Sequence, residues 1–243
     1  MHYRVHYRIY KKRRFCKAYF HKDKSKPLYI IGYFSIHMDK NIYRILPQET
    51  DIISLYLANY SKALHVREIA RLLNANHRTI SLALQELEKK QVMISKQIGK
   101  NKEYKLNINN ISTREYIRLS EIIKHLQLIE KHPFLKKFMK NFNFSNTPML
   151  LFGSYAKGIE KKDSDIDLII FTDVKLKTGT EKRIKEFFDT YNKKVQIQKA
   201  NRDDFEKGIR EKDPLILEII QNHIIINNSA FFIGMLWRYA HEK

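Results

Sequence analysis

The chain has 243 residues, of which 43% are hydrophobic and 30% charged, and its single cysteine, Cys16, excludes an intrachain disulfide framework. This composition argues against wholesale disorder and suits two small domains. No apolar run reaches the roughly 18 residues that a membrane helix needs. The basic start also lacks the apolar run and cleavage site of a signal peptide. We therefore expect a cytoplasmic protein with no membrane partner.

The formal net charge of +20 is concentrated in the first two thirds of the chain. Residues 1–46 hold 12 basic and 2 acidic residues, residues 47–145 hold 17 and 9, and residues 146–243 hold 17 and 15. This division favours a polyanion-binding front and a catalytic or regulatory back. A Lys-rich surface without a partner is the alternative.

Residues 1–46 form a basic extension in which Tyr and Phe are mixed with Lys and Arg. Such a mixture can hold single-stranded nucleic acid by stacking and charge. The segment has no helical or strand period, however, and we favour a poorly ordered extension. Because Met38 opens a stretch typical of the start of a domain, it stays open whether residues 1–37 belong to the native protein.

The front region, residues 47–107, alternates amphipathic helical segments with short extended ones. Ile80, Leu84 and Leu87 recur at the spacing of one helix face, and Asn76 is suited to cap that helix. The predicted elements are helices over 48–60, 66–73 and 77–90, and strands over 63–65, 92–98 and 103–106, the last two joined by a hairpin tip at 99–102.

This order resembles the winged helix-turn-helix family, and the resemblance implies DNA binding by the third helix in the major groove. Arginine can pair with guanine there, whereas Ser, Thr and Lys mostly contact phosphate. A dimerisation or protein-docking module is the alternative. The candidate DNA-binding residues are His77, Arg78, Thr79 and Ser81 on the helix and Lys100 and Lys102 at the hairpin.

Residues 108–145 predict one or two connecting helices, broken near Pro133. The back region, residues 146–243, alternates buried extended runs with helical ones. Its predicted elements are strands over 148–152, 165–171 and 194–199, and helices over 180–191, 214–221 and 231–241.

The back region carries a motif of Gly153-Ser154, ten intervening residues and Asp165-Ile166-Asp167. Side chains at i and i+2 of a strand share a face, so the two carboxylates are expected side by side. Two like charges held together favour a bound cation, and oxygen ligands with open positions suit Mg²⁺. Gly153 lets a phosphate approach the backbone closely, and Ser154 adds a hydroxyl. Lys157 can steer a triphosphate or be an ordinary solvated charge.

The motif resembles that of the minimal nucleotidyltransferases of the polymerase-β superfamily, and Ala156, Gly158 and Ser164 match it as well. The resemblance implies a small mixed sheet flanked by helices, and with the front region an α+β protein. It also implies transfer of a nucleoside monophosphate from an NTP to a macromolecular acceptor such as a partner toxin. AMP is the first candidate for the transferred group, and one or two Mg²⁺ ions are the implied cofactors. The implied roles are catalysis and metal binding for Asp165 and Asp167, and nucleotide binding for Gly153, Ser154 and Lys157.

The sequence departs from this family where a third carboxylate is expected on the next strand. Gln196 and Gln198 stand there, and an amide carries no charge and cannot act as a base. Asp203 and Asp204 follow, but we predict them at the start of a helix. A DNA-binding regulator with a catalytically weak or inactive nucleotide domain is therefore the alternative function. The oligomeric state stays open, a dimer being one option.

Overall fold

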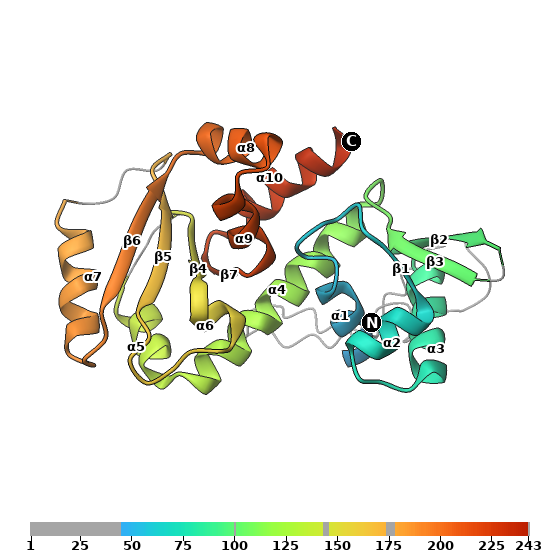
Figure 1. Ribbon diagram of the computed structural model, residues 1–243, viewed down its shortest axis with the longest axis horizontal. Coiled ribbons are helices and arrows are strands. Elements are labelled where there is room, and N and C mark those ends of the chain that lie inside the picture. Colours follow the sequence, from blue (N-terminus) through green and yellow to red (C-terminus); the bar gives the residue numbers. More distant parts are fainter. Residues whose placement is uncertain (1–44, 100, 143–145, 174–177, 243) are drawn as a thin grey trace, which may run out of the picture. The chain divides into compact units, whose positions relative to one another are not determined.

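The computed structural model describes residues 45–99, 101–142, 146–173 and 178–242 (Figure 1). All of them fall in one compact unit, Arg44–Lys243. The prediction of a poorly ordered segment over residues 1–46 thus lies almost entirely outside the described residues. In the described part, no helix is both long and apolar enough to cross a bilayer.

The front region folds in the predicted order of elements. These are α1 (Pro47–Ser54), β1 (Ala63–His65), α2 (Val66–Leu72), α3 (His77–Lys89), β2 (Met93–Ile98) and β3 (Asn101–Leu106). The three strands form one antiparallel sheet in the order β1-β3-β2. The Asn76 side chain accepts a hydrogen bond of 2.8 Å from the Arg78 backbone N–H, so the predicted helix cap is present.

The first helix is shorter than the predicted 48–60. It ends at Ser54, and the backbone N–H groups of Leu55 and Tyr56 bond the carbonyls three residues before them. The chain then tightens into turns, yet Tyr56 stays fully buried. Its hydroxyl donates to the Tyr104 carbonyl at 2.9 Å, which ties the turn to β3. Beyond Ser54 the chain is thus held by turns and a long-range hydrogen bond instead of a second half of the predicted helix.

Two connecting helices, α4 (Ile111–Lys131) and α5 (Pro133–Asn141), are broken at His132, as predicted from Pro133. α4 contacts both α1 and α10 (Ser229–His241). Ser120 donates to the Thr50 carbonyl at 3.1 Å, and Lys124 donates to the His223 carbonyl at 2.7 Å. The connecting segment is therefore a structural helix that joins the front elements to the back ones (Figure 1).

The back region is built on a mixed sheet of four strands in the order β6-β5-β4-β7. β5 and β6 are parallel, and the other pairs are antiparallel. The remaining elements are β4 (Met149–Phe152), α6 (Gly153–Lys157), β5 (Ile166–Phe171), α7 (Thr180–Asp189), β6 (Val195–Ala200), α8 (Arg202–Glu211), α9 (Pro214–Gln221) and β7 (Ile224–Asn227).

Alternate residues of β5 point into two different cores. Ile166, Leu168 and Ile170 pack with apolar residues of α5 and α7. Ile169 and Phe171 pack with residues of α8, α9 and α10, in a core that also includes the front region. The sheet is thus flanked by helices on both faces, as expected. β7 was not predicted, because a short, continuous apolar run such as Ile224–Ile226 has no alternation that separates a strand from a buried helix.

Candidate nucleotide site

The glycine-serine turn lies directly against one of the two motif acids. β4 ends at Phe152, whose register partner on β5 is Asp167, so Gly153 follows beside that carboxylate. Gly153 has φ +70°, and a Cβ built on it would lie 2.1 Å from the Asp167 Oδ2 atom. Any other residue would collide with the acid and strain the backbone. The structure therefore brings Gly153 and Asp167 into contact.

Asp165 and Asp167 lie on the same face of the sheet edge. Asp167 is the register partner of Gln196 on β6. The Gln196 Nε2 group donates a 3.0 Å hydrogen bond to Oδ2 of Asp165, so all three side chains meet on one side. Between the acids, Ile166 is fully buried in the core on the opposite face. This is the alternation that the sequence predicts for i and i+2 positions.

Negative charge accumulates at this sheet edge. Burial raises the pKa of the Asp167 carboxyl above its ordinary value of 3.8, and the carboxylates of Asp165 and Glu218 raise it further. Within the described residues, neither motif acid forms an ion pair. An uncompensated pair of carboxylates is the arrangement that a bound cation stabilises.

The donor set fits Mg²⁺ bound to a triphosphate better than an all-protein metal cage. In the described part of the chain, no group of three or more His, Cys, Asp or Glu side chains is placed to hold a metal ion. Asp165 and Asp167 would supply two carboxylates. Phosphate oxygens and water would complete the octahedral shell that this ion prefers.

Of the other two predicted nucleotide-binding residues, Ser154 lies half-buried at the second position of α6, next to Gly153. Lys157 ends α6, and its Nζ atom lies 2.7 Å from Oε1 of Glu218 on α9. Sequence reasoning missed Glu218, since it stands 61 residues from Lys157 and belongs to no motif. Glu218 thus lies near enough for its charge to raise the pKa of Asp167, after burial and Asp165, but within the described residues it does not join the two motif acids in a metal-binding group.

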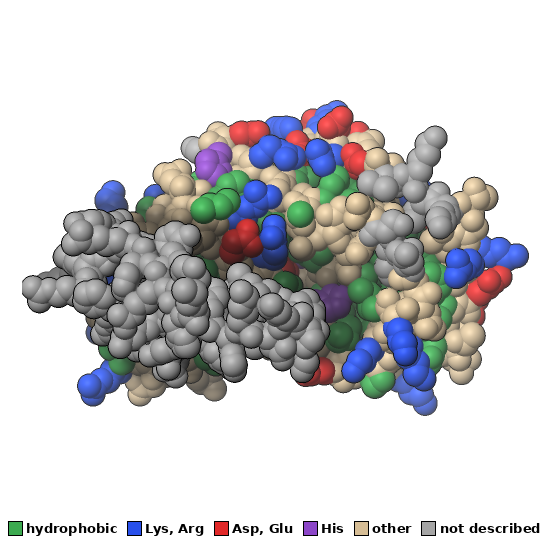
Figure 2. Space-filling model, turned by 180° about the vertical axis from the view of Figure 1, so that it is seen from behind, with side chains coloured by type: hydrophobic (Ala, Val, Ile, Leu, Met, Phe, Trp, Pro, Cys, Tyr) green, Lys and Arg blue, Asp and Glu red, His purple; other side chains and the backbone are tan. Residues whose placement is uncertain are grey.

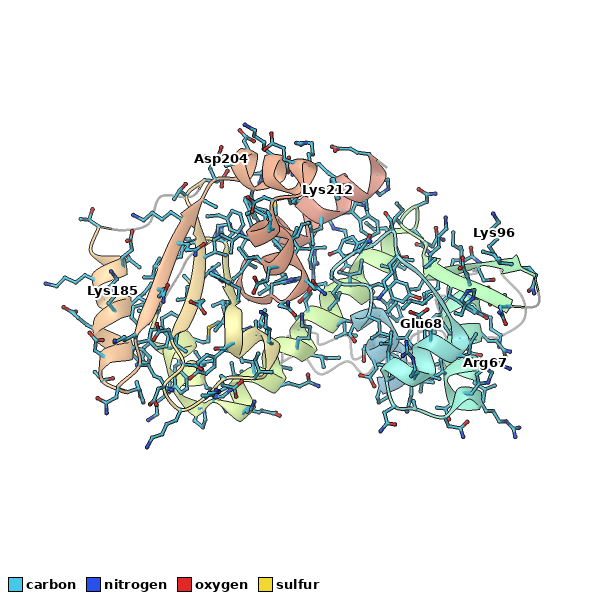
Figure 3. The ribbon with its side chains drawn as sticks, in the orientation of Figure 1. Arg67, Glu68, Lys96, Lys185, Asp204 and Lys212 are labelled. Atoms are coloured by element: carbon cyan, nitrogen blue, oxygen red, sulfur yellow. The ribbon has the colours of Figure 1, made fainter. Side chains whose placement is uncertain are left out.

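The two other acids weighed for the third position are remote from the turn. Asp203 and Asp204 lie in the first turn of α8, after the carboxyl end of β6, where the Asn201 side chain caps the helix. Gln196 stands at the opposite end of that six-residue strand, about 15–20 Å away. Figure 3 shows Asp204 at the start of α8. Their prediction as residues of a helix start is confirmed.

Four of the predicted DNA-binding residues lie together at the start of α3, and Lys102 lies on β3. His77, Arg78 and Thr79 are exposed in the first turn of α3, and Ser81 is half-buried. Lys102 is held by an ion pair of 2.8 Å to Glu88 on α3, and its ammonium group lies over the Tyr104 ring. Lys100 lies outside the described residues.

An open hollow of about 610 Å³ lies beside the start of α3, and three Lys or Arg side chains and two His side chains lie in its wall. Arg67 and Arg71 of α2 face it, and sequence reasoning missed both, although they recur at one-turn spacing. Figure 3 shows Arg67 on α2 and Lys96 on β2. Basic side chains also occur at several separate places on the face seen in Figure 2, with acidic ones beside some of them. The hollow is lined by His65, Val66, Arg67, Glu68, Arg71, His77, Asn101 and Lys102.

Residues 133–227, from the start of α5 to the end of β7, match the family model described as "Nucleotidyltransferase domain". The chain therefore contains a nucleotidyltransferase domain that includes the glycine-serine turn, both motif acids and Glu218. No curated protein matches the chain.

Two solved structures resemble the chain weakly. One is a toxin-antitoxin structure with AMP-PNP, at 13% identity and a TM-score of 0.29. The other is a mutant of the toxin-antitoxin pair MntA-HpeT, at 10% identity and a TM-score of 0.28. Each match covers 49% of this chain and 82% of the other. These scores are too low to assign a role to any residue of this chain.

Proposed function

We propose that the chain is a Mg²⁺-dependent nucleotidyltransferase that moves a nucleoside monophosphate from an NTP to a hydroxyl of a macromolecule. The observation that carries this proposal is the contact between Gly153 and the Asp167 carboxylate, beside Asp165. A cation between these acids and a phosphate against the bare glycine backbone would occupy one shared place. The nucleotidyltransferase family match over residues 133–227 supports the same reaction class.

In the proposed reaction, the acceptor oxygen attacks the α-phosphorus and forms a new phosphoester bond. The bond from the α-phosphorus to the oxygen that bridges to the β-phosphate breaks, and pyrophosphate leaves with that electron pair. The hydroxyl proton passes to solvent or to a base. Bound Mg²⁺ supplies charge neutralisation at the phosphates. Asp165 and Asp167 would hold the ion, and the backbone of Gly153 and Ser154 would orient the triphosphate by close approach.

ATP is the first candidate donor, and the product of a neighbouring toxin gene is the first candidate acceptor. Both assignments rest on the family that the motif resembles. They are tested by incubating the protein with Mg²⁺ and each of four labelled NTPs, with and without the neighbouring gene product. We expect the label to move to the acceptor. Asp165→Asn or Asp167→Asn should lower the rate at least about 100-fold, because each removes several kcal/mol of metal-borne stabilisation.

The alternative is a DNA-binding regulator with a weak or inactive nucleotide domain. It is favoured by Gln196, which stands where a third carboxylate is expected and donates a hydrogen bond to Asp165. It predicts that wild-type protein and Asp167→Asn give the same background with all four NTPs and every acceptor. That result would contradict the proposed enzymatic function.

We also propose that the front region, as a winged helix-turn-helix module, binds DNA. The exposed first turn of α3 and the basic hollow beside it support this proposal. Each phosphate contact contributes about 0.9 to the dependence of log K on log salt. Binding to the gene's own upstream DNA should therefore weaken with salt, and Arg78→Ala should weaken it further.

Lys185→Ala on α7 makes the same change in charge at an exposed site of the back region and is the matched control. If Arg78→Ala and Lys185→Ala bind the DNA equally well, the front region acts in protein docking or dimerisation instead.

A further inference from the structure

Glu218 reaches the nucleotide site through Lys157. Gly153 and Lys157 are the first and last residues of α6 and stand four positions apart, so they lie on one face of that turn. Gly153 contacts Asp167, and Lys157 holds Glu218 at 2.7 Å. The two carboxylates are therefore gathered on the same side of α6.

The packing of α9 brings Glu218 to this face independently of the ion pair. Ile219 and Ile220 of α9 pack in the same core as Ile169, the residue that shares the face of Asp167 on β5. α9 is also held firmly against α8, because a Cβ on Gly208 would lie 2.8 Å from Ile216. The position of Glu218 thus follows from the fold. Its charge adds to the effects of burial and of Asp165, which raise the pKa of Asp167.

The ion pair itself is weakly held. The Lys157 and Glu218 side chains are 33% and 47% exposed. Pairs this exposed contribute little to stability, since water screens them. A triphosphate, which carries more charge than one carboxylate, can take the ammonium group over without disturbing the core.

We propose that Glu218 is a positioning residue that holds the Lys157 ammonium group in place of a phosphate and competes with the triphosphate for it. This inference rests on the proposed nucleotide site. A metal-free triphosphate needs the Lys157 ammonium group to offset its charge beside the two motif carboxylates, whereas a Mg²⁺-bound one brings its own neutralising charge. Glu218 therefore makes the site select metal-bound over metal-free triphosphate.

The inference is tested by calorimetric titration of ATP into the protein, once with Mg²⁺ and once with a chelator. We expect Glu218→Gln to bind metal-free ATP about fivefold more tightly than wild type, which is the upper range for release of an exposed ion pair. Glu211→Gln is the control, since Glu211 stands within ion-pair distance of Lys207 on the exposed surface of α8. It should bind like wild type.

A second variant shows whether the effect passes through Lys157. In Lys157→Ala/Glu218→Gln, the gain should disappear relative to Lys157→Ala alone, because the two side chains act as one unit. If the gain persists, or if Glu218→Gln binds as weakly as Glu211→Gln, the inference is wrong while the nucleotide site stands. If wild-type protein and Asp167→Asn both fail to bind ATP with Mg²⁺, the proposed function and the inference fail together. Melting curves of all variants establish that they are folded.

Discussion

Carboxylates are treated in opposite ways in two regions of this molecule. Where α4 meets the start of β7, Glu121 is 2% exposed, and its Oε1 atom lies 2.9 Å from Nε2 of His223. Lys124 lies close to the same carboxylate. At the edge of β5, Asp165 and Asp167 instead lie beside each other, and the side chain bonded to Asp165 is the neutral amide of Gln196.

The difference separates groups that stabilise the fold from groups that bind. Buried charges are tolerated when an opposite charge and hydrogen bonds compensate them, as for Glu121. Like charges held close together lower the stability of the fold, and they are found at sites where they bind a ligand or an ion. Removal of a carboxylate charge should therefore change the free energy of unfolding with opposite signs in the two regions.

The largest effect is expected at the buried pair. Glu121→Ala should lower the free energy of unfolding by about 3–5 kcal/mol, because it leaves His223 buried without its partner. Chemical denaturation measures this loss. Glu115→Ala, on the exposed side of the same helix, removes a pair of Glu115 with Arg118 and should cost less than about 1 kcal/mol. Equal losses in the two variants would show that the buried pair stabilises the fold no more than the exposed pair does.

An intermediate effect is expected at the glycine turn. Gly153→Ala should cost about 2–4 kcal/mol and also abolish ATP binding, since the new methyl group displaces the Asp167 carboxylate. Gly179→Ala is the matched control. Gly179 also has positive φ, at +82°, but no atom of the described residues lies within 4 Å of an added Cβ. It should show the backbone strain alone and keep ATP binding; loss of binding in both variants would contradict the contact.

The smallest effect has the opposite sign. Asp167→Asn should raise the free energy of unfolding at neutral pH by less than about 1 kcal/mol, because it removes like-charge repulsion from a partly exposed group. The raised pKa of Asp167 means that its ionisation disfavours the folded state. The gain should therefore shrink as the pH falls through the raised pKa and vanish below 3.8, where the wild-type carboxyl is protonated in both states.

Glu121 predicts the reverse dependence on pH. Burial alone would raise the pKa of its carboxyl, but His223 and Lys124 hold it below the ordinary value of 4.5. The stabilisation is present above 4.5 and is lost as the pH falls through the folded-state pKa. Denaturation of wild type, Asp167→Asn and Glu121→Ala across acid pH separates the two dependences. If Asp167→Asn instead lowers the free energy of unfolding at neutral pH, the assignment of Asp165 and Asp167 as functional acids is wrong.

The acidic pair and the turn could be read from the sequence because they are local. Strand alternation fixes Asp165 and Asp167 on one face, and the bare Gly153 follows a buried strand. Glu218 could not be found in this way, since α9 packing brings it from 61 residues away. β7 and the early end of α1 also depend on partners distant in sequence, namely the edge of β4 and the Tyr104 carbonyl. The residues of one local motif could be predicted from the sequence, whereas a residue that tertiary packing brings to the site could not.

The most direct test of the account is a structure of the protein with Mg²⁺ and a non-hydrolysable ATP analogue. We predict an ion bound by both Asp165 and Asp167 at about 2.1 Å, with the phosphates against the backbone of Gly153 and Ser154. A triphosphate bound elsewhere, or an ion held by neither acid, would contradict the proposed nucleotide site.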